Sequence, residues 1–474
     1  MITTGKIAEN GSINILGSIL DCLINLIISM LLARYFGQAG FGKLSFLAAF
    51  IFFLAAADNQ WIRPILVREM SRDKNNSPGI IGNGLIIRVM ISLCAVILFW
   101  IAILIVNPPW DVKILALFAS LGLLSAPLIS SYETIFQVSL KMKYFVGLNL
   151  LNRLLILAVI FMVVILKKGL IAFYILAFIP TIILLFLLKY FSKGIIDPDF
   201  KINTALWRMI FKESWPLGIS AFFIFVYNRV DQIIILYFRG PQDLGLYAAG
   251  LRLKEVLNII PLALMMPMLP VLSGYFNSSR KDFVKIYQGS FKYLLIFIVP
   301  LAVVVSLFPR QILYLFYGSQ FSIAGLSLTI LIWSEVFVFM GVVNNSILIA
   351  SNKQIFDPLF TGISALVNII LNLILIPRYG FIGAAISALA CCAAGPLTGL
   401  FINATREYSY SMIKFSLKPL SASLLAAYLI YCLHLDLQQS ILLFPLIYLL
   451  IMYLIKGINK DDIILVKSII IKSR

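Results

Sequence analysis

The chain alternates between long apolar runs and short polar connections along nearly its whole length. Each of fourteen runs holds about 20 mostly apolar residues, the length that an α-helix needs to cross the hydrocarbon core of a membrane. The runs are continuous and lack the alternating pattern of a membrane β-barrel. The pattern therefore predicts an all-α, polytopic membrane protein with helices over residues 13–33, 43–62, 82–106, 113–132, 145–166, 170–188, 215–238, 246–273, 293–309, 323–348, 356–376, 380–403, 415–433 and 440–455.

The overall composition agrees with this pattern. Of the 474 residues, 61% are hydrophobic and only 12% are charged, against about 25% charged in an average globular chain. A soluble fold cannot bury so much apolar surface, because a single core stops growing at about 250–300 residues. Soluble enzymes, disordered chains and nucleic-acid-binding proteins are thereby excluded.

Cysteine and histidine do not form a pattern that predicts a metal centre. The five cysteines all lie within apolar runs and are interpreted as small buried hydrophobic residues, and His434 is the one histidine of the sequence. We expect no metal, no catalytic residues and no cofactor. The chain is expected not to be an enzyme. If it is a transporter, H+ or Na+ is the candidate ion to which transport is coupled.

Basic residues indicate how the chain crosses the membrane. Lys and Arg are retained on the cytoplasmic side. With the N-terminus inside, the cytoplasmic segments hold 25 basic residues and the opposite loops hold 8. Both termini are therefore expected to be cytoplasmic, and the short outer loops leave no room for an extracytoplasmic domain.

Two glycine-bounded turns predict an internal duplication. The turns follow the first and the seventh apolar runs, 203 residues apart, and are bounded by Gly37 and Gly42 and by Gly240 and Gly245. A second echo pairs Gly169 with Gly380, before runs six and twelve. These repeats predict two six-helix halves that cross the membrane in the same orientation. Transporters built from such repeats place the substrate path between the halves.

The duplication suggests the domain boundaries. We expect an N-terminal six-helix bundle, a linker, a second bundle related to the first by pseudo-symmetry, and a C-terminal helix pair. Their ranges are 1–190 for the N-terminal bundle, 191–214 for the cytoplasmic linker, 215–403 for the C-terminal bundle, and 404–474 for the last two helices and a cytoplasmic tail.

Charged residues inside the predicted spans are the candidate functional groups, because a charge in the bilayer core usually faces a cavity or a partner. Five of them share a depth of about 10–14 Å below the outer surface at about 1.5 Å per residue: Arg229, Asp231, Arg252, Lys254 and Glu255. One interpretation is a structural ion-pair cluster, for instance Asp231 with Arg252. In the other, the surplus cation among Arg229, Arg252 and Lys254 meets an anionic substrate.

Four further candidate residues are charged and lie inside other spans. Arg88 and Arg153 enter from the cytoplasmic side, and either snorkel to the headgroups or bind a phosphate, which the planar guanidinium suits. Asp21 and Glu335 lie near mid-membrane with no basic residue close in the sequence. Together with Asp231 and Glu255, they are candidates for ion coupling or for ion pairs.

Four motifs spread over the chain are distinctive: LARYFG at 32–37, NRVDQ at 228–232, LGLYAA at 244–249 and NLILIPRYG at 372–380. They resemble the polysaccharide (O-antigen type) flippases of the multidrug/oligosaccharidyl-lipid/polysaccharide exporter superfamily. The resemblance covers residues from about 10 to 400, and it places Arg229 and Asp231 at matching motif positions.

The resemblance implies a function for the whole chain. Such a flippase moves undecaprenyl-diphosphate-linked oligosaccharide from the cytoplasmic to the periplasmic leaflet of the bacterial inner membrane by alternating access. The product serves the biosynthesis of O-antigen, lipopolysaccharide or another surface polysaccharide. The implied partners are this lipid-linked oligosaccharide, membrane lipids, a polysaccharide polymerase and a chain-length regulator.

Two other functions stay open at this point. An ion-coupled drug or metabolite exporter of the same superfamily typically stops at twelve spans and needs only acidic residues for cationic substrates. A membrane enzyme, such as a polymerase or an acyltransferase, needs a catalytic constellation at one leaflet. The short outer loops and the single histidine argue against the enzyme.

Overall fold

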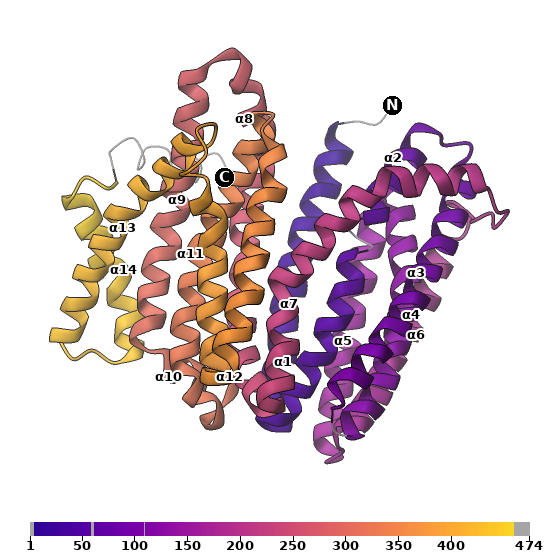
Figure 1. Cartoon of the computed structure of the whole chain (residues 1–474), viewed down its shortest axis with the longest axis horizontal. Helices are drawn as coiled ribbons and strands as arrows, with labels where there is room; N and C mark the ends of the chain where they lie inside the picture. Colours follow the sequence, from indigo (N-terminus) through magenta and orange to yellow (C-terminus); the bar gives the residue numbers. More distant parts are fainter. Residues whose placement is uncertain (1–3, 58–60, 109, 459–474) are drawn as a thin grey trace. The chain divides into compact units, whose positions relative to one another are not determined.

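The computed structural model describes residues 4–57, 61–108 and 110–458, and α-helices account for most of this part of the chain (Figure 1). The helices pack as two units, which are described separately. The first unit comprises residues 1–252 and 368–384, and the second comprises residues 253–367 and 385–474. Asp58, at the inner end of the second predicted span, and the predicted cytoplasmic tail lie outside the described residues.

Three helices are too long for one membrane crossing. They are α1 (Thr4–Ala57), α7 (Thr204–Glu255) and α12 (Asp357–Thr398). Even the shortest of them, α12 with 42 residues, would extend about 63 Å as a straight helix at about 1.5 Å per residue. Each is broken by one glycine in the left-handed region, with φ of 69° at Gly37, 83° at Gly240 and 56° at Gly380. A residue with a Cβ rarely adopts such a φ, so these glycines mark the turns between consecutive spans.

The fourteen predicted spans are confirmed by this division. Within the described residues, eleven helical stretches are long and apolar enough to cross a membrane. Three of them contain one of the turn glycines and therefore count as two spans each, which gives fourteen. Many leucine and isoleucine side chains along these helices are exposed, such as Leu104 at 70% and Ile105 at 73%. Apolar side chains exposed along helix after helix suit contact with lipid. The protein is therefore a multi-pass, all-α membrane protein.

The first unit is a bundle formed by the N-terminal helices, most of α7 and a part of α12. Within it, α1 packs against α5, α4 against α3 and α6, and α5 against α6. Besides α1 and α7, its helices are α2 (Arg63–Arg72), α3 (Ser77–Val106), α4 (Trp110–Val138), α5 (Met142–Ile165) and α6 (Leu170–Ser192).

The second unit has an apolar core rich in aromatic side chains. Its core joins α8, α9, α11 and α13 through aromatic side chains such as Phe283, Phe291 and Phe339, each 1% exposed or less. Its helices are α8 (Ile259–Ser278), α9 (Arg280–Leu307), α10 (Pro309–Tyr317), α11 (Gly325–Ala350), α13 (Arg406–Cys432) and α14 (Leu437–Leu454), with 3-10 turns η2 (Val256–Asn258), η3 (Ser319–Ala324) and η4 (Gln354–Phe356).

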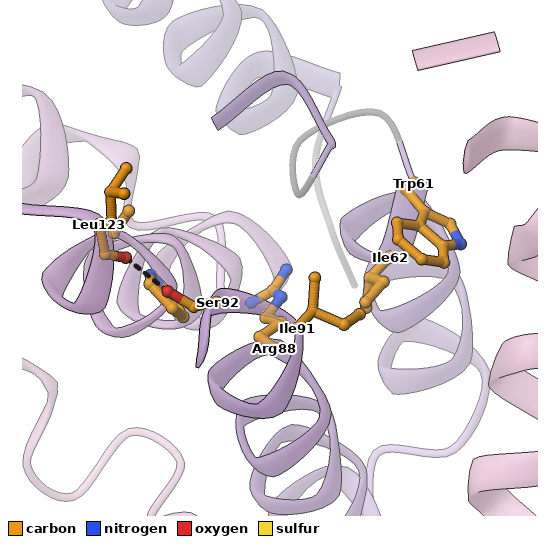
Figure 2. A pocket seen from close by; sticks show the side chains of 8 residues that line it. Trp61, Ile62, Arg88, Ile91, Ser92 and Leu123 are labelled. Carbon is orange, nitrogen blue, oxygen red and sulfur yellow. Dashed lines mark hydrogen bonds between the residues drawn. The ribbon is translucent and has the colours of Figure 1, made fainter. Parts of the chain in front are cut away.

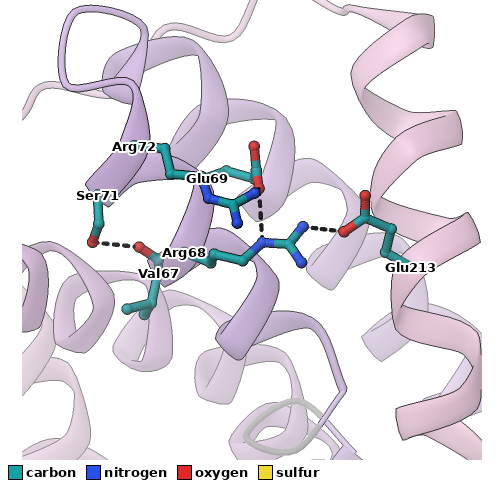
Figure 3. Close-up of polar contacts among 6 residues, drawn as sticks. All are labelled: Val67, Arg68, Glu69, Ser71, Arg72 and Glu213. Atoms are coloured by element: carbon teal, nitrogen blue, oxygen red, sulfur yellow. Dashed lines mark hydrogen bonds and ion pairs between the residues drawn. The ribbon is translucent and has the colours of Figure 1, made fainter.

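The connection after α6 joins the first unit more closely than its polar sequence suggests. Its last part, from Thr204, is helical and continues without interruption into the span of α7. Ile210 is fully buried and Trp207 packs beside it, against residues of α2 and α3. Ion pairs also join α2 to α7 here. Arg68 of α2 contacts Glu69 on its own helix and Glu213 on α7 (Figure 3).

Candidate functional site

The two repeat turns of the sequence meet each other inside the first unit. A Cβ added to Gly42 would collide with the carbonyl oxygen of Pro241, and a Cβ added to Gly245 would collide with that of Gln38. These two contacts are equivalent, because each joins the last glycine of one turn to the second residue of the other. The glycines recognised as a sequence repeat are therefore the residues that let the two hairpins touch backbone to backbone.

Below this junction, Arg229 and Asp231 lie on α7 and are both buried. The Arg229 guanidinium lies 4.4 Å from the centre of the Phe52 ring on α1. With the Gln232 amide oriented to suit its neighbours, Gln232 accepts from Arg229 Nη1 at 3.0 Å and donates to the Ser45 carbonyl at 3.0 Å. Arg229 is thus held between the second span and the seventh.

Asp231 accepts a hydrogen bond from the hydroxyl of Tyr247, across the hairpin of α7. Tyr247 was not among the predicted site residues, although it lies in the LGLYAA motif. The signal was available, because Asp231 and Tyr247 are eight residues on either side of Arg239, next to the turn glycine. Residues equidistant from a tight turn face each other in an antiparallel helix pair.

Asp21 and Arg153 form an ion pair between α1 and α5, with Arg153 Nε 2.7 Å from Asp21 Oδ1. Asn25, one turn along α1, donates to the other carboxylate oxygen at 2.9 Å. Within the described residues, the two Nη groups of Arg153 donate no hydrogen bond. The carboxylate therefore orients the guanidinium through one edge and leaves its terminal donors available.

The exposure of this pair distinguishes it from the other intramembrane charges. The side chain of Arg153 is 35% exposed and that of Asp21 is 37% exposed, in the middle of their helices. Exposed charges are costly against hydrocarbon and in known membrane proteins face water or a protein cavity. The Asp21–Arg153 pair therefore differs in its surroundings from the buried Lys254–Glu335 pair.

Arg88 lies on α3 and is 2% exposed. It donates to the hydroxyl of Ser131 at 3.0 Å and to that of Thr134 at 3.4 Å, both on α4. A cavity of about 30 Å³ lies beside it, lined by Trp61, Ser92 and Pro127 among others (Figure 2). This volume admits a water molecule but no sugar or diphosphate.

In the second unit, Lys254 and Glu335 form a buried pair between the end of α7 and α11. Lys254 Nζ lies 3.2 Å from Glu335 Oε1 and donates to the Ser334 hydroxyl at 2.9 Å. Glu335 is fully buried and Lys254 is 8% exposed. Arg252 and Glu255, the remaining predicted residues, are partly buried on the same stretch of α7 and have polar contacts of their own.

The predicted residues thus fall into local groups in the structure. Asp21 meets Arg153, Lys254 meets Glu335, and Arg229 and Asp231 lie near each other on α7, while Arg88 stands with hydroxyls on α4. Sequence reasoning missed the hydroxyl partners Ser131, Thr134 and Ser334, since small polar side chains are common in membrane helices. Among the described residues, no group of three His, Cys, Asp or Glu side chains suits a metal ion.

Comparison with solved structures places the fold. The lipid II flippase MurJ, in an inward closed conformation, superposes with a TM-score of 0.79 at 20% identity, over 95% of this chain and 99% of that one. An inward-facing multidrug resistance transporter of the MATE family superposes with a TM-score of 0.66 at 14% identity, over 83% and 96%. At these identities the likeness shows the fold alone.

The class of protein follows: a multi-pass helical protein with the fold of the multidrug/oligosaccharidyl-lipid/polysaccharide exporter superfamily. A family model described as polysaccharide biosynthesis protein matches residues 7–276, more than half of the chain, and a MatE model matches residues 216–374. The chain belongs to the polysaccharide biosynthesis protein family. The resemblance identified from the sequence motifs is confirmed.

Two curated relatives share part of this sequence. The probable low-salt glycan biosynthesis flippase Agl15 of Haloferax volcanii is 25% identical over 195 residues, 40% of this chain and 41% of that protein. The capsular polysaccharide biosynthesis protein CapF of Staphylococcus aureus is 24% identical over 204 residues, 43% of this chain and 50% of that one. The match thus spans half or less of each relative's length.

Proposed function

We propose that this protein is a flippase for lipid-linked oligosaccharides, which carries the diphosphate-sugar head of a polyprenyl lipid from the cytoplasmic to the outer leaflet of a bacterial inner membrane by alternating access. The observation that carries the proposal is the partly exposed Asp21–Arg153 pair, which joins α1 to α5. Family membership and the name of Agl15, a probable glycan biosynthesis flippase, support it.

The chemistry of the cargo explains why such a pair is useful. A diphosphate and several sugars lose their hydration in hydrocarbon, which costs several kcal/mol for each unpaired polar group (~2–7). A guanidinium binds phosphate oxygens in pairs through parallel N–H donors. Arg153 is oriented through Nε by Asp21, so its Nη groups can bind an oxygen pair of the passing diphosphate.

Asp21 keeps the site from trapping its cargo in this proposal. The carboxylate neutralises Arg153 when no substrate is present, so this guanidinium is paired in the empty carrier. The diphosphate binds the Nη groups while Asp21 stays on Nε, and the negative charge of the carboxylate weakens this binding, so the head can be released on the outer side. The step is binding and release only, and no bond of the substrate is made or broken, so we propose a transporter rather than an enzyme.

The buried cations have supporting roles in this proposal. Arg229 is held by Phe52 and Gln232 and contributes positive potential near the outer turn. Arg88, Arg252 and Lys254 stay candidates for binding the diphosphate head. Asp231, Glu255 and Glu335 stay candidates for coupling to H+ or Na+, and a polymerase and a chain-length regulator stay candidate partners.

The test is transport by purified protein in liposomes. A fluorescent undecaprenyl-diphosphate oligosaccharide is incorporated, and its movement between leaflets is followed by quenching with external dithionite. We expect Arg153→Ala to reduce the rate about 100-fold or more, since a charge-assisted bidentate contact is lost. Arg153→Lys should recover only part of the rate, because an ammonium keeps the charge and loses the fork.

The matched control is Arg208→Ala, which removes an exposed arginine of α7 from the same unit. Its rate should equal that of the unaltered protein. Arg229→Ala in the same assay is expected to slow transport while the protein still inserts and folds. Unchanged transport by Arg153→Ala would contradict the proposal.

A second function is favoured by one observation, the MatE model match over residues 216–374. An ion-coupled exporter of drugs or metabolites would use Asp21 and Glu335 as cation or proton sites. Cells producing the protein would then expel a cationic dye such as ethidium, and Asp21→Asn or Glu335→Gln would abolish the efflux. Dye efflux without oligosaccharide transport would favour this second function.

A further inference from the structure

A cavity of about 220 Å³ in the second unit is lined by four lysines. Lys292 lies on α9, Lys414 and Lys418 lie one turn apart on α13, and Lys456 follows the end of α14. None of these residues belongs to the intramembrane charges described above. The other lining residues include Ile296, Phe415, Pro419 and Met452, so the cavity joins a cluster of ammonium groups to an apolar wall.

The walls of this cavity are fixed by the helix packing. The hydroxyl of Tyr448 on α14 donates to the Ile296 carbonyl of α9 at 3.1 Å. Lys456 has a φ of 53°, and the following Gly457 donates back to the Met452 carbonyl at 2.8 Å, which closes the end of α14 in a Schellman-type turn. Lys418 Nζ donates to the Lys456 carbonyl at 2.9 Å. The turn thereby holds Lys456 beside α13.

Three of the four lysines of the cavity have no carboxylate partner among the described residues. Within residues 4–458 as described, Lys414, Lys418 and Lys456 form no ion pair with a carboxylate. Like charges gathered at one place repel each other unless an anion binds among them. The site is therefore suited to an anion of one or two negative charges.

The helix ends around the cavity have the character of a membrane–water boundary. Tyr410 on α13 is 64% exposed and Tyr453 on α14 is 51% exposed, and exposed tyrosines gather at headgroup level. Leu417 and Leu454, also at these ends, are 59% and 69% exposed. The basic-residue bias of the sequence predicts that these ends face the cytoplasm. Basic pockets between helices at that level bind anionic headgroups.

We propose that this four-lysine cavity binds the phosphate of an anionic glycerophospholipid, with an acyl chain against Phe415, Met452 and Ile296. The shared chemistry is a phosphate anion, which a lipid headgroup or a free phosphate can supply. The apolar lining favours the lipid, because a free phosphate gains nothing from these side chains. The site is separate from the proposed transport path, and its test uses binding rather than transport, so the two proposals fail independently.

The test measures binding of dioleoylphosphatidylglycerol to the full chain purified in neutral detergent, by native mass spectrometry and by the shift in thermal unfolding midpoint. The variant is Lys414→Gln/Lys418→Gln, which keeps helix-forming side chains of similar length. We expect its affinity to fall about 30-fold, the loss expected from two lysines at a membrane surface. Lys414→Arg/Lys418→Arg should bind as the unaltered protein does.

The matched control is Lys281→Gln/Lys285→Gln, which removes two exposed lysines of α9 outside the cavity. Its affinity for phosphatidylglycerol should stay within about twofold of the unaltered protein, less than half a kcal/mol. Equal losses in the two double variants would show a general charge effect and overturn the site.

Two further probes separate the sources of the phosphate. Dioleoylphosphatidylcholine, which has a phosphate but no net charge, should bind much more weakly at the same concentration. Inorganic phosphate at millimolar concentration should neither stabilise the protein nor displace phosphatidylglycerol. Equal stabilisation by inorganic phosphate, or equal binding of the two lipids, would overturn the assignment to an anionic lipid.

Discussion

The intramembrane charges of this chain are stabilised in three different ways. Asp21 and Arg153 pair while partly exposed, Lys254 and Glu335 pair while buried, and Arg88 is buried among hydroxyls. A buried pair has lost its hydration and is committed to its partner, whereas an exposed pair can still bind a further ion. This difference is why we assign transport to Arg153, and why we expect the Lys254–Glu335 pair to contribute to stability.

The buried pair leads to a prediction on stability. Glu335→Leu leaves the Lys254 ammonium without its carboxylate and should cost about 3–5 kcal/mol of unfolding free energy. Lys254→Met/Glu335→Leu should recover most of that loss, because the double change removes both charges and keeps the volume. The measurement is thermal or denaturant unfolding in detergent. A double variant as unstable as Glu335→Leu would mean that the pair is not the cause.

At the scale of the elements, three glycines divide long helices into hairpins, and two others let the hairpins pack. Gly37, Gly240 and Gly380 have positive φ and mark the turns. Gly42 and Gly245 have no room for a Cβ, because the backbone of the opposite turn lies against them. Arg239 adds to the junction by donating to the carbonyls of Ile376 and Arg378.

Gly42→Ala and Gly245→Ala should therefore destabilise the protein by similar amounts. Each added methyl group meets a carbonyl oxygen that cannot move without shifting a hairpin, and overpacking of this kind costs about 1–3 kcal/mol. The control is Gly147→Ala on α5, where an added Cβ meets nothing within 4 Å. The control should be neutral or slightly stabilising, since alanine favours helix over glycine. Unfolding midpoints of the three variants would test this, and equal midpoints would contradict it.

At the scale of the whole molecule, the distribution of basic residues predicts the orientation in the membrane. Lys168 lies in the turn between α5 and α6, and Lys281 lies in the first turn of α9; both are exposed. Their loops are predicted on opposite sides, the first outside and the second in the cytoplasm. Labelling each position with a membrane-impermeant reagent tests the orientation of the chain.

In a variant without the five native cysteines, Lys168→Cys should react with an impermeant maleimide added to intact cells. Lys281→Cys should react only after the membrane is permeabilised. The reverse pattern would place both termini outside, and labelling of both positions in intact cells would contradict the fourteen-span topology.

Spans and turns were predictable because they depend on local sequence. The length of an apolar run decides whether a helix can cross the membrane, and a glycine permits the positive φ that a tight turn between helices needs. The short helices α2 and α10 were not predicted, since each has only ten residues or fewer and mixes charged with apolar side chains. Cys94 and Cys432, expected to be buried, are exposed, because an apolar residue of a membrane helix can face lipid as well as protein.

Some contacts of the charged residues also follow from local sequence, and others do not. Asp231 with Tyr247 follows from the hairpin alone, since both lie at equal distances from one turn. Asp21 with Arg153 joins residues 132 apart on α1 and α5, and no register in the sequence relates these helices. The sequence by itself determined which residues enter the membrane, where the chain turns and which charges lie in its spans. Only helix packing decided which charges meet and which stay exposed, because membrane helices associate through side-chain shape, and shape is complete only when the bundle is assembled.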